Sequence, residues 1–317
     1  LLPGMDTEIT INLKNQGSQT ASDFTIELIS IDNYITVNSG IINSVNIEAG
    51  NYLSLNGFDL SFNNDIINGS IFPMELLLTS SDGHSRIENF NITVGEVRED
   101  DPLGPDAYGY YIYDYTDTDY DLAPTYNWIE IADALGEQLE IYDQGNGGGG
   151  TTYYTNNSTL IDLPFSFTFY GIDYDQIVVS SNGWISFGDF LMYSFRNYPI
   201  PGAGGPSPMV AAFWDDLKTG GGYVYYYETE EYVVIQWDDL RTFDNNGQFY
   251  ETFEIILYNK VFYSPTITGD SEIKIQYSEF NNTSDGYYPN GGTPTHGCYS
   301  TIVNGFKLLS PSIITLM

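Results

Sequence analysis

Two pairs of adjacent carboxylates are the residues best placed to do chemistry. Asp215 and Asp216 follow Trp214, and Asp238 and Asp239 follow Trp237 in a similar pattern. Two acids about 5–10 Å apart can act as acid and base in glycoside cleavage. Neighbouring residues on a strand point to opposite faces, so Asp215 and Asp216 do not face each other, whereas Asp215 and Asp238 could. Glycosidase chemistry, calcium binding or backbone capping, and solvated strand ends are the alternatives for these acids.

A second acidic stretch reads YDYTDTDYDLAP. Its candidate calcium ligands are Asp114, Asp117, Asp119 and Asp121. Oxygen-rich spacing of this kind suits a hard cation such as calcium. An EF-hand is excluded, because Pro124 stands where its sharp turn requires glycine. The stretch is predicted to be either a calcium loop of another kind or a solvated acidic loop, and calcium is the one cofactor that we expect.

The single cysteine lies close to a histidine, in His296-Gly297-Cys298. A catalytic cysteine needs a base that a third group orients, and no such group is evident. We therefore predict a lone thiol and no catalytic residues in this chain. With one cysteine, no internal disulfide is possible.

Aromatic residues surround a turn in the stretch FYGIDYDQIVVSSNGWISFG, residues 169 to 188. Asn182-Gly183 supplies the positive φ angles of a tight hairpin, and Trp184 follows directly. Core packing of the hairpin is the first interpretation. The alternative is a sugar-stacking platform, because aromatic faces suit the C–H groups of carbohydrates. The candidate ligand-binding residues are Trp184, Asn182, Trp214, Asp215, Asp216 and Asp238.

Strands must position these residues, because apolar and polar side chains alternate along most of the chain. Residues 1–95 hold about seven such segments between turn signals, a size typical of an immunoglobulin-like β-sandwich. Residues 96–106 are charged, contain prolines and lack alternation, so we predict a linker there. Residues 107–317 are predicted to form a larger two-sheet, jelly-roll-like sandwich. The predicted fold class is all-β.

The second half contains the predicted strands that carry the candidate residues. They are 110–113, 127–131, 165–169, 176–180, 184–187, 209–213, 222–227, 232–237, 252–258 and 272–277. Residues 131–139 give the one helical signal.

The charge balance excludes several classes of partner. Nine Lys and Arg residues stand against 43 Asp and Glu residues, a formal net charge of −34. Nucleic acids and anionic membranes bind basic patches, so we expect neither as a partner. No apolar run approaches the roughly 20 residues of a membrane span. The chain starts in mid-pattern at Leu1 without a signal peptide, and we interpret it as a piece of a longer secreted or cell-surface bacterial protein.

Several segments of the second half resemble a known module. FSFTFYGIDYDQIVVSSNGWISFG, PSPMVAAFWDDL, GGYVYYYE, YVVIQWDDL and ETFEIILY are similar to a repeated module of large secreted bacterial proteins. Those proteins include gingipain-like (family C25) and subtilisin-like peptidases of Bacteroidetes-type bacteria. The same motif order resembles, more distantly, the extracellular NIDO domain of animal adhesion proteins. The first half, with ITINLKNQGS and FNITVG, resembles the Ig-like, CARDB-type domains found beside such peptidases.

Two departures limit what the resemblance implies. A C25 peptidase has a His/Cys pair in an α/β domain, which this chain lacks, so peptidase activity does not carry over. After Ile302 the module is expected to continue through further aromatic strands, but the chain reads VNGFKLLSPSIITLM. We expect a truncation or a reading-frame change near Val303, with a tail that packs poorly or pairs as an edge strand.

These observations predict a non-catalytic accessory region that acts in adhesion or in targeting to a substrate or glycan. The expected partners are a glycan or protein outside the cell and the neighbouring domains of the parent chain. A purely structural stalk or assembly module is the alternative. A glycoside hydrolase that uses Asp215 and Asp238 is the third hypothesis.

Overall fold

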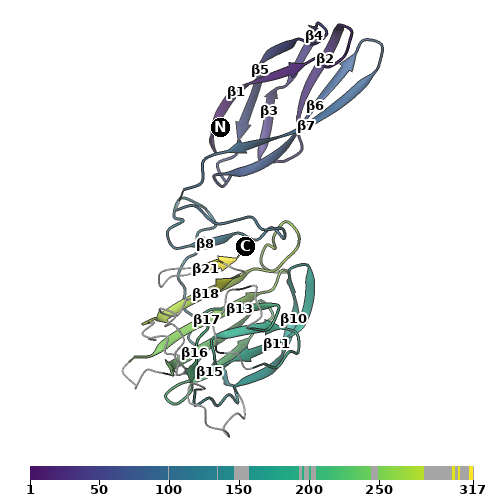
Figure 1. The fold of residues 1–317 in the computed structure, drawn as a ribbon. Coiled ribbons are helices and arrows are strands. Elements are labelled where there is room, and N and C mark those ends of the chain that lie inside the picture. Colours follow the sequence, from purple (N-terminus) through teal and green to yellow (C-terminus); the bar gives the residue numbers. More distant parts are fainter. Residues whose placement is uncertain are drawn as a thin grey trace, which may run out of the picture. The chain divides into compact units, whose positions relative to one another are not determined.

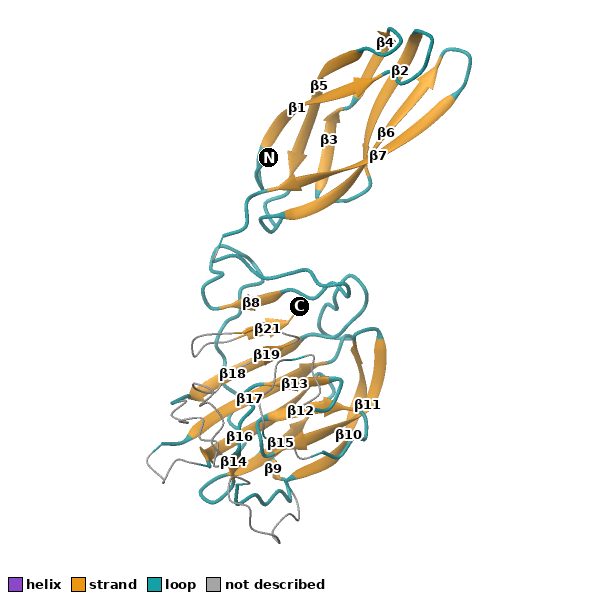
Figure 2. Cartoon of the chain, viewed as in Figure 1, coloured by secondary structure: helices purple, strands orange, loops and turns teal. Residues whose placement is uncertain are grey.

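The computed structural model divides the chain into two compact units. Unit 1 comprises Leu1–Asp101 and Thr116–Asp121, and unit 2 comprises Pro102–Tyr115 and Leu122–Met317. The structure describes residues 1–98, 100–133, 135–145, 157–192, 195, 200, 205–243 and 249–281, and the backbone of 302–303, 306–307 and 314–316. All regular elements among these residues are strands (Figures 1 and 2), which confirms the predicted all-β class. None of the described residues belongs to a helix that could cross a membrane.

Seven antiparallel strands form the two sheets of unit 1. One sheet has the order β1-β5-β3, and the other has the order β4-β2-β6-β7. Alternate side chains point inward, so Ile26, Leu60 and Met74 are fully buried in one core. The strands are β1 (Asp6–Lys14), β2 (Ala21–Ser30), β3 (Ile35–Ser39), β4 (Ile41–Ile47), β5 (Tyr52–Phe62), β6 (Ser70–Ser80) and β7 (Ser85–Val94).

Two larger antiparallel sheets form unit 2. The six-stranded sheet has the order β10-β11-β12-β13-β19-β20. The eight-stranded sheet has the order β8-β21-β18-β17-β16-β15-β9, with β14 beside β16. The strands are β8 (Ile112–Asp114), β9 (Glu137–Gln138), β10 (Ser158–Phe169), β11 (Ile172–Ser180), β12 (Trp184–Phe187), β13 (Met209–Ala211), β14 (Leu217–Lys218), β15 (Tyr223–Glu228), β16 (Tyr232–Thr242), β17 (Glu251–Tyr258), β18 (Ile273–Glu279), β19 (Ile302–Val303), β20 (Phe306–Lys307) and β21 (Ile314–Leu316).

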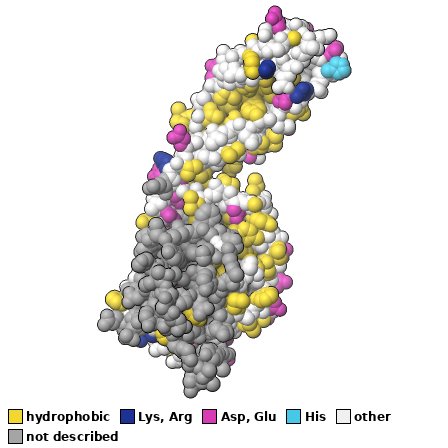
Figure 3. All heavy atoms as spheres, viewed as in Figure 1, with side chains coloured by type: hydrophobic (Ala, Val, Ile, Leu, Met, Phe, Trp, Pro, Cys, Tyr) yellow, Lys and Arg dark blue, Asp and Glu magenta, His cyan; other side chains and the backbone are white. Residues whose placement is uncertain are grey.

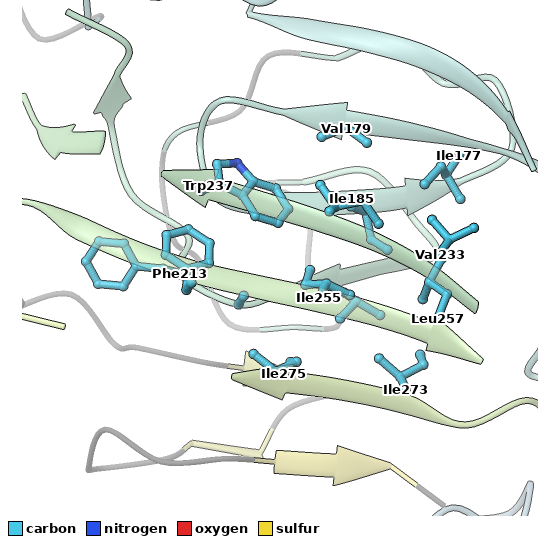
Figure 4. Close-up of a cluster of buried hydrophobic side chains, with 14 of the residues drawn as sticks. Ile177, Val179, Ile185, Phe213, Val233, Trp237, Ile255, Leu257, Ile273 and Ile275 are labelled. Atoms are coloured by element: carbon cyan, nitrogen blue, oxygen red, sulfur yellow. The ribbon is translucent and has the colours of Figure 1, made fainter. Parts of the chain in front are cut away.

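The main core of unit 2 lies between these two sheets. Ile177 and Ile185 of the six-stranded sheet face Val233, Ile255 and Ile275 of the eight-stranded sheet (Figure 4), and all five side chains are fully buried. Period-two alternation produces this arrangement, because every second residue of β16, β17 and β18 points to the core. The residues between them point to the outer face of the eight-stranded sheet.

One tryptophan connects the two sheets. The indole of Trp237 on β16 stacks on Phe253 of β17, with ring centroids 5.0 Å apart. Its Nε1–H donates a hydrogen bond of 2.8 Å to the carbonyl of Ser180, at the end of β11. Trp237 is fully buried, so this bond satisfies a polar group that would otherwise lack a partner in the core.

The prediction of a strand over residues 127–131 is wrong. The segment contributes to no ladder of the described strands and lies against the outer face of the eight-stranded sheet. The backbone N–H groups of Asn127 and Ile131 donate to the side chains of Gln276 and Gln236. The predicted helical signal over 131–139 also fails, because the described residues of that range form turns and the short strand β9.

The last described residues form short strands in both sheets. β19 pairs with β13 and β20 in the six-stranded sheet, where β20 is at the edge. β21 lies between β8 and β18, an interior position in the eight-stranded sheet. The change expected near Val303 stays a prediction.

The same truncation at a buried and at an exposed isoleucine tests the core. Ile255→Ala is expected to lower the free energy of unfolding of unit 2 by about 2–5 kcal/mol, because Ile255 is fully buried. Ile267 is 92% exposed, and Ile267→Ala is expected to change the free energy of unfolding by less than about 0.5 kcal/mol. All four tryptophans lie in unit 2, so their fluorescence during urea unfolding reports this unit. Equal losses in the two variants would contradict the assigned core.

Candidate functional site

The turn Ser180–Gly183 joins β11 to β12 and contains the predicted ligand-binding residue Asn182. The Asn182 side chain is fully buried, and its Oδ1 accepts the N–H of Leu217 at 3.0 Å. The Gly183 carbonyl accepts the N–H of Phe213 at 3.1 Å. The turn therefore holds the segment after β13, which carries the predicted acid pair.

Gly183 allows a close approach that no other residue permits. Its φ is +74°, in the left-handed region. A Cβ atom at this position would lie 1.9 Å from the carbonyl oxygen of Phe213. The Asn-Gly pair is thus required both for the turn and for the contact of the turn with the neighbouring segment.

Both predicted tryptophans of the sugar-stacking platform are buried. Trp184 and Trp214 are 0% and 3% exposed, and they pack with Met209 in a cluster apart from the main core. Ile185 points to the main core, so the adjacent Trp184 points to the outer side of the six-stranded sheet. The structure brings the two rings together, and their burial leaves no ring face for stacking with a ligand.

The two predicted acid positions lie in different surroundings. Asp215 follows β13, and its Oδ1 accepts the N–H of Asp216 at 2.8 Å, which is a backbone-capping contact. Asp238 lies on the outer face of β16, where its Oδ1 accepts a 3.3 Å hydrogen bond from Gln236. Burial, followed by the charges of Asp239 and Glu130, raises the pKa of Asp238 to about 6. The described hydrogen bonds of Asp215 and Asp238 thus go to different residues.

Asp143 is a buried acid that the sequence did not single out. It is 4% exposed, and its carboxylate accepts hydrogen bonds from Ser181 Oγ at 2.6 Å and from the N–H of Gly145 at 2.8 Å. Burial raises its pKa. The bond to Gly145, two residues on, is an Asx turn, and Asp143-Gln-Gly is the local signal for it. Asp143 thereby fixes the turn that holds Asn182.

The four predicted calcium ligands are divided between the two units. Asp114 is the last residue of β8 in unit 2, whereas Asp117, Asp119 and Asp121 belong to the segment of unit 1. Asp117 is buried, and Asp121 is exposed. The described residues contain no group of three or more His, Cys, Asp or Glu side chains arranged to hold a metal.

Arg98 contacts this acidic segment of unit 1. Its guanidinium lies 3.7 Å from a carboxylate oxygen of Asp119 and 3.5 Å from one of Asp101. The Asp101 carboxylate also accepts hydrogen bonds from Tyr120 at 2.6 Å and from Asn68 at 3.1 Å. These bonds and Arg98 keep the pKa of Asp101 below its usual value although burial alone would raise it. Asp119 and Tyr120 of the segment thus both contact residues at the end of the preceding part of unit 1.

A shallow hollow of about 490 Å³ opens beside β10 and β11. It lies where the register of these strands shifts between Asp162 and Phe167, and such irregularities re-aim side chains. The Asp162 carboxylate accepts a 2.6 Å hydrogen bond from the amide of Gln176. The hollow is lined by Asp162, Leu163, Asp173, Tyr174, Asp175, Gln176 and Gly188.

The second half of the chain is similar to a known domain family. Residues 137–293 match the family model described as NIDO related, which supports the predicted NIDO-like character of this region. No curated protein matches the chain. A NIDO-related, all-β domain fits a non-catalytic accessory module. The predicted His296 and Cys298 lie outside the described residues.

Two glycine substitutions separate a backbone clash from left-handed strain. Gly188 has a φ of +92°, and a Cβ added to it would have no atom within 4 Å, so Gly188→Ala is expected to cost about 1–2 kcal/mol. Gly183→Ala adds the clash with Phe213 and is expected to cost several kcal/mol more or to prevent folding. Urea unfolding followed by tryptophan fluorescence measures both. Similar costs for the two variants would mean that the close contact at Gly183 is not required.

Calcium at the acidic segment of unit 1 stays a prediction with a direct test. If Asp117, Asp119 and Asp121 bind calcium, a chelator is expected to lower the melting temperature of unit 1, because the ion binds the folded state only. Calorimetry or tyrosine circular dichroism would follow this transition. Asp119→Asn should reduce the response to the chelator, and Asp65→Asn, elsewhere on unit 1, should not. A melting temperature that is equal with calcium and with chelator contradicts the site.

Proposed function

We propose that this chain is a non-catalytic accessory region of a secreted or cell-surface bacterial protein, and that unit 2 attaches that protein to a glycan. The NIDO-related match over residues 137–293 supports an accessory module. The resemblance to modules of gingipain-like and subtilisin-like peptidases supports a peptidase as the parent. In this proposal unit 1, as an Ig-like domain of the CARDB type, spaces unit 2 from neighbouring domains.

The hollow beside β10 and β11 is the observation that supports glycan binding. Asp162, Asp175 and Gln176 provide carboxylate and amide groups that can hydrogen-bond to sugar hydroxyls. The half-buried ring of Tyr174 provides an apolar surface beside them. A shallow site with several polar groups and one aromatic ring suits the end of a glycan better than an apolar ligand.

The polar groups of the hollow are held in place before a ligand arrives. Gln176 donates to Asp162 at 2.6 Å. Asp173 accepts a hydrogen bond from Thr168 and lies 3.5 Å from the ammonium group of Lys260. The Thr168 bond, followed by Lys260, lowers the pKa of Asp173, so this carboxylate is charged at neutral pH. Such preorganisation reduces the entropy lost on binding.

A protein partner is a second candidate, supported by exposed apolar side chains near the hollow. Thr266 donates to the carbonyl of Tyr108 at 3.0 Å, which places the exposed Ile267 beside Tyr108. A Cβ on Gly171 would lie 3.1 Å from the Tyr108 ring, and the exposed Ile172 follows Gly171. Figure 3 shows apolar side chains among acidic ones on the described surface of unit 2. An apolar surface with acidic neighbours suits a partner that presents apolar and basic groups.

Neither alternative function has comparable support. A hydrolase needs two converging carboxylates, and the described hydrogen bonds of Asp215 and Asp238 give no support to convergence of these two. A stalk without a small ligand needs no preorganised hollow. It remains the alternative that the binding experiment tests.

Glycan-array screening of the purified chain tests the proposal. Asp162→Asn with Asp175→Asn is expected to lower the affinity for any glycan that binds by about tenfold or more, because charged hydrogen-bond acceptors are lost. Glu230→Gln with Glu231→Gln on the turn between β15 and β16 changes the net charge equally and is expected to leave binding unchanged. Absence of any bound glycan would contradict glycan targeting. Binding that survives the first pair of substitutions would exclude the hollow.

A further inference from the structure

Residues 125–131, here called the strap, lie on the outer face of the eight-stranded sheet. Side chains of three strands hold the strap by its main chain, in place of a neighbouring strand. On β18, the ammonium group of Lys274 donates to the carbonyl of Thr125 at 2.7 Å. Gln276 accepts the N–H of Asn127 and donates to its carbonyl, both at 2.8 Å.

Two further main-chain contacts of the strap with the sheet come from β17 and β16. Glu254 on β17 accepts the N–H of Ile129 at 3.4 Å. Gln236 on β16 accepts the N–H of Ile131 at 2.9 Å. The N–H groups of every second strap residue thus point to the sheet, as expected for an extended chain.

Apolar packing between the strap and the sheet involves two of the strap's isoleucines. Ile131 is the strap's one buried side chain, and it packs against Val234 and Ile256. Ile129 is half-buried against the same cluster. Most of the other strap residues are exposed. The strap therefore depends on its polar contacts more than a core strand does.

Glu254 occupies the centre of these contacts. Its side chain is fully buried, and Oε1 also accepts a 2.6 Å hydrogen bond from the amide of Gln276. Oε2 is buried and has no hydrogen-bond partner in the described part of the chain. A carboxylate anion with one buried oxygen unpaired is costly, whereas a protonated carboxyl is tolerated.

The groups around Glu254 act in both directions on its ionisation. Lys274 on β18 favours the anion, and Glu130 of the strap disfavours it. Tyr232 on β16 and Tyr258 on β17 are the other titratable neighbours. Burial is the largest effect and raises the pKa of Glu254 to about 8 from an ordinary value of 4.5, although bonds from Gln276 and Ile129 oppose it.

We propose that the strap is a proton-linked latch, which is closed over the sheet when Glu254 carries a proton and is loosened when Glu254 ionises. Opening would hydrate the carboxylate and expose Gln236, Gln276 and the apolar side chains beneath the strap. The latch lies on a different sheet from the hollow of β10 and β11, and it does not depend on glycan binding.

The direction of the pH effect follows from the two pKa values of Glu254. The closed state has the raised pKa of about 8, and the hydrated open state has a pKa near 4.5. The closed state is therefore most favoured below pH 4.5. As the pH rises from 4.5 to 8, the opening equilibrium increases by about tenfold per pH unit, and above pH 8 it becomes constant.

Amide hydrogen exchange measured by NMR between pH 5 and 9 tests the latch. Exchange chemistry alone accelerates about tenfold per pH unit, so the amides of Asn127, Ile129 and Ile131 are expected to accelerate about a hundredfold per unit below pH 8. Above pH 8 their acceleration should return to about tenfold. Glu254→Gln cannot ionise and is expected to give tenfold acceleration throughout.

A second raised carboxyl provides the matched control. Glu272 has a pKa of about 7 through burial and lies near Lys274, but none of the strap's described hydrogen bonds involves it. Glu272→Gln should keep the steep acceleration and the change near pH 8. Tenfold acceleration of the strap amides at every pH in the unmodified chain overturns the latch, as does a steep dependence that survives in Glu254→Gln. The change near pH 8 in the unmodified chain decides the matter if Glu254→Gln does not fold.

Discussion

The contact between Trp237 and the turn Ser180–Gly183 joins the two sheets of unit 2 inside their common core. Trp237 belongs to the eight-stranded sheet, and the carbonyl that it binds belongs to the six-stranded sheet. Gly183 then accepts the N–H of Phe213, and Asn182 accepts that of Leu217. The turn thereby sets the path of the chain from β13 to β14. A change of shape here would move both sheets and the acid pair together, because interiors are close-packed.

Much of the fold could be predicted from alternation alone. The strand predicted over residues 184–187 has the observed bounds of β12, and the inward residues of β16 to β18 form the expected core. Residues 127–131 show why prediction failed elsewhere. Ile129 and Ile131 alternate as in a strand, and the segment is extended with one side against the protein. Alternation reports which side is buried, but it does not report whether a strand or a set of side chains binds the backbone.

The candidate site was less predictable, because residue types do not reveal whether the outer face of a sheet is covered by other parts of the chain. Trp184 alternates with Ile185 and so points away from the main core, a position usually open to solvent in a two-sheet sandwich. In this chain Met209 and Trp214 cover it. The hollow was missed for a different reason. Asp162 and Asp175 lie on consecutive strands, and both line the hollow at the point where the pairing of β10 with β11 becomes irregular, which residue types alone do not reveal.

The outer face of the eight-stranded sheet is also covered, and its polar residues show how. Gln236, Glu254 and Gln276 stand at the outward positions of three neighbouring strands and are nevertheless fully buried. Sequence reasoning assigns such positions to solvent, where a polar side chain needs no partner.

In the structure each of these side chains binds the backbone of the strap. A further strand at the same place could not bind there, because strands bind one another edge to edge and not face to face. Side chains are the only groups of a sheet that reach a segment lying across its face. The strap covers part of the outer face of β16 to β18, and Met209 and Trp214 pack on that of β12 at Trp184. The described surface that a partner can reach includes the edge strand β10, where the hollow lies, and the loop after β17, which carries the exposed Val261, Phe262 and Ile267.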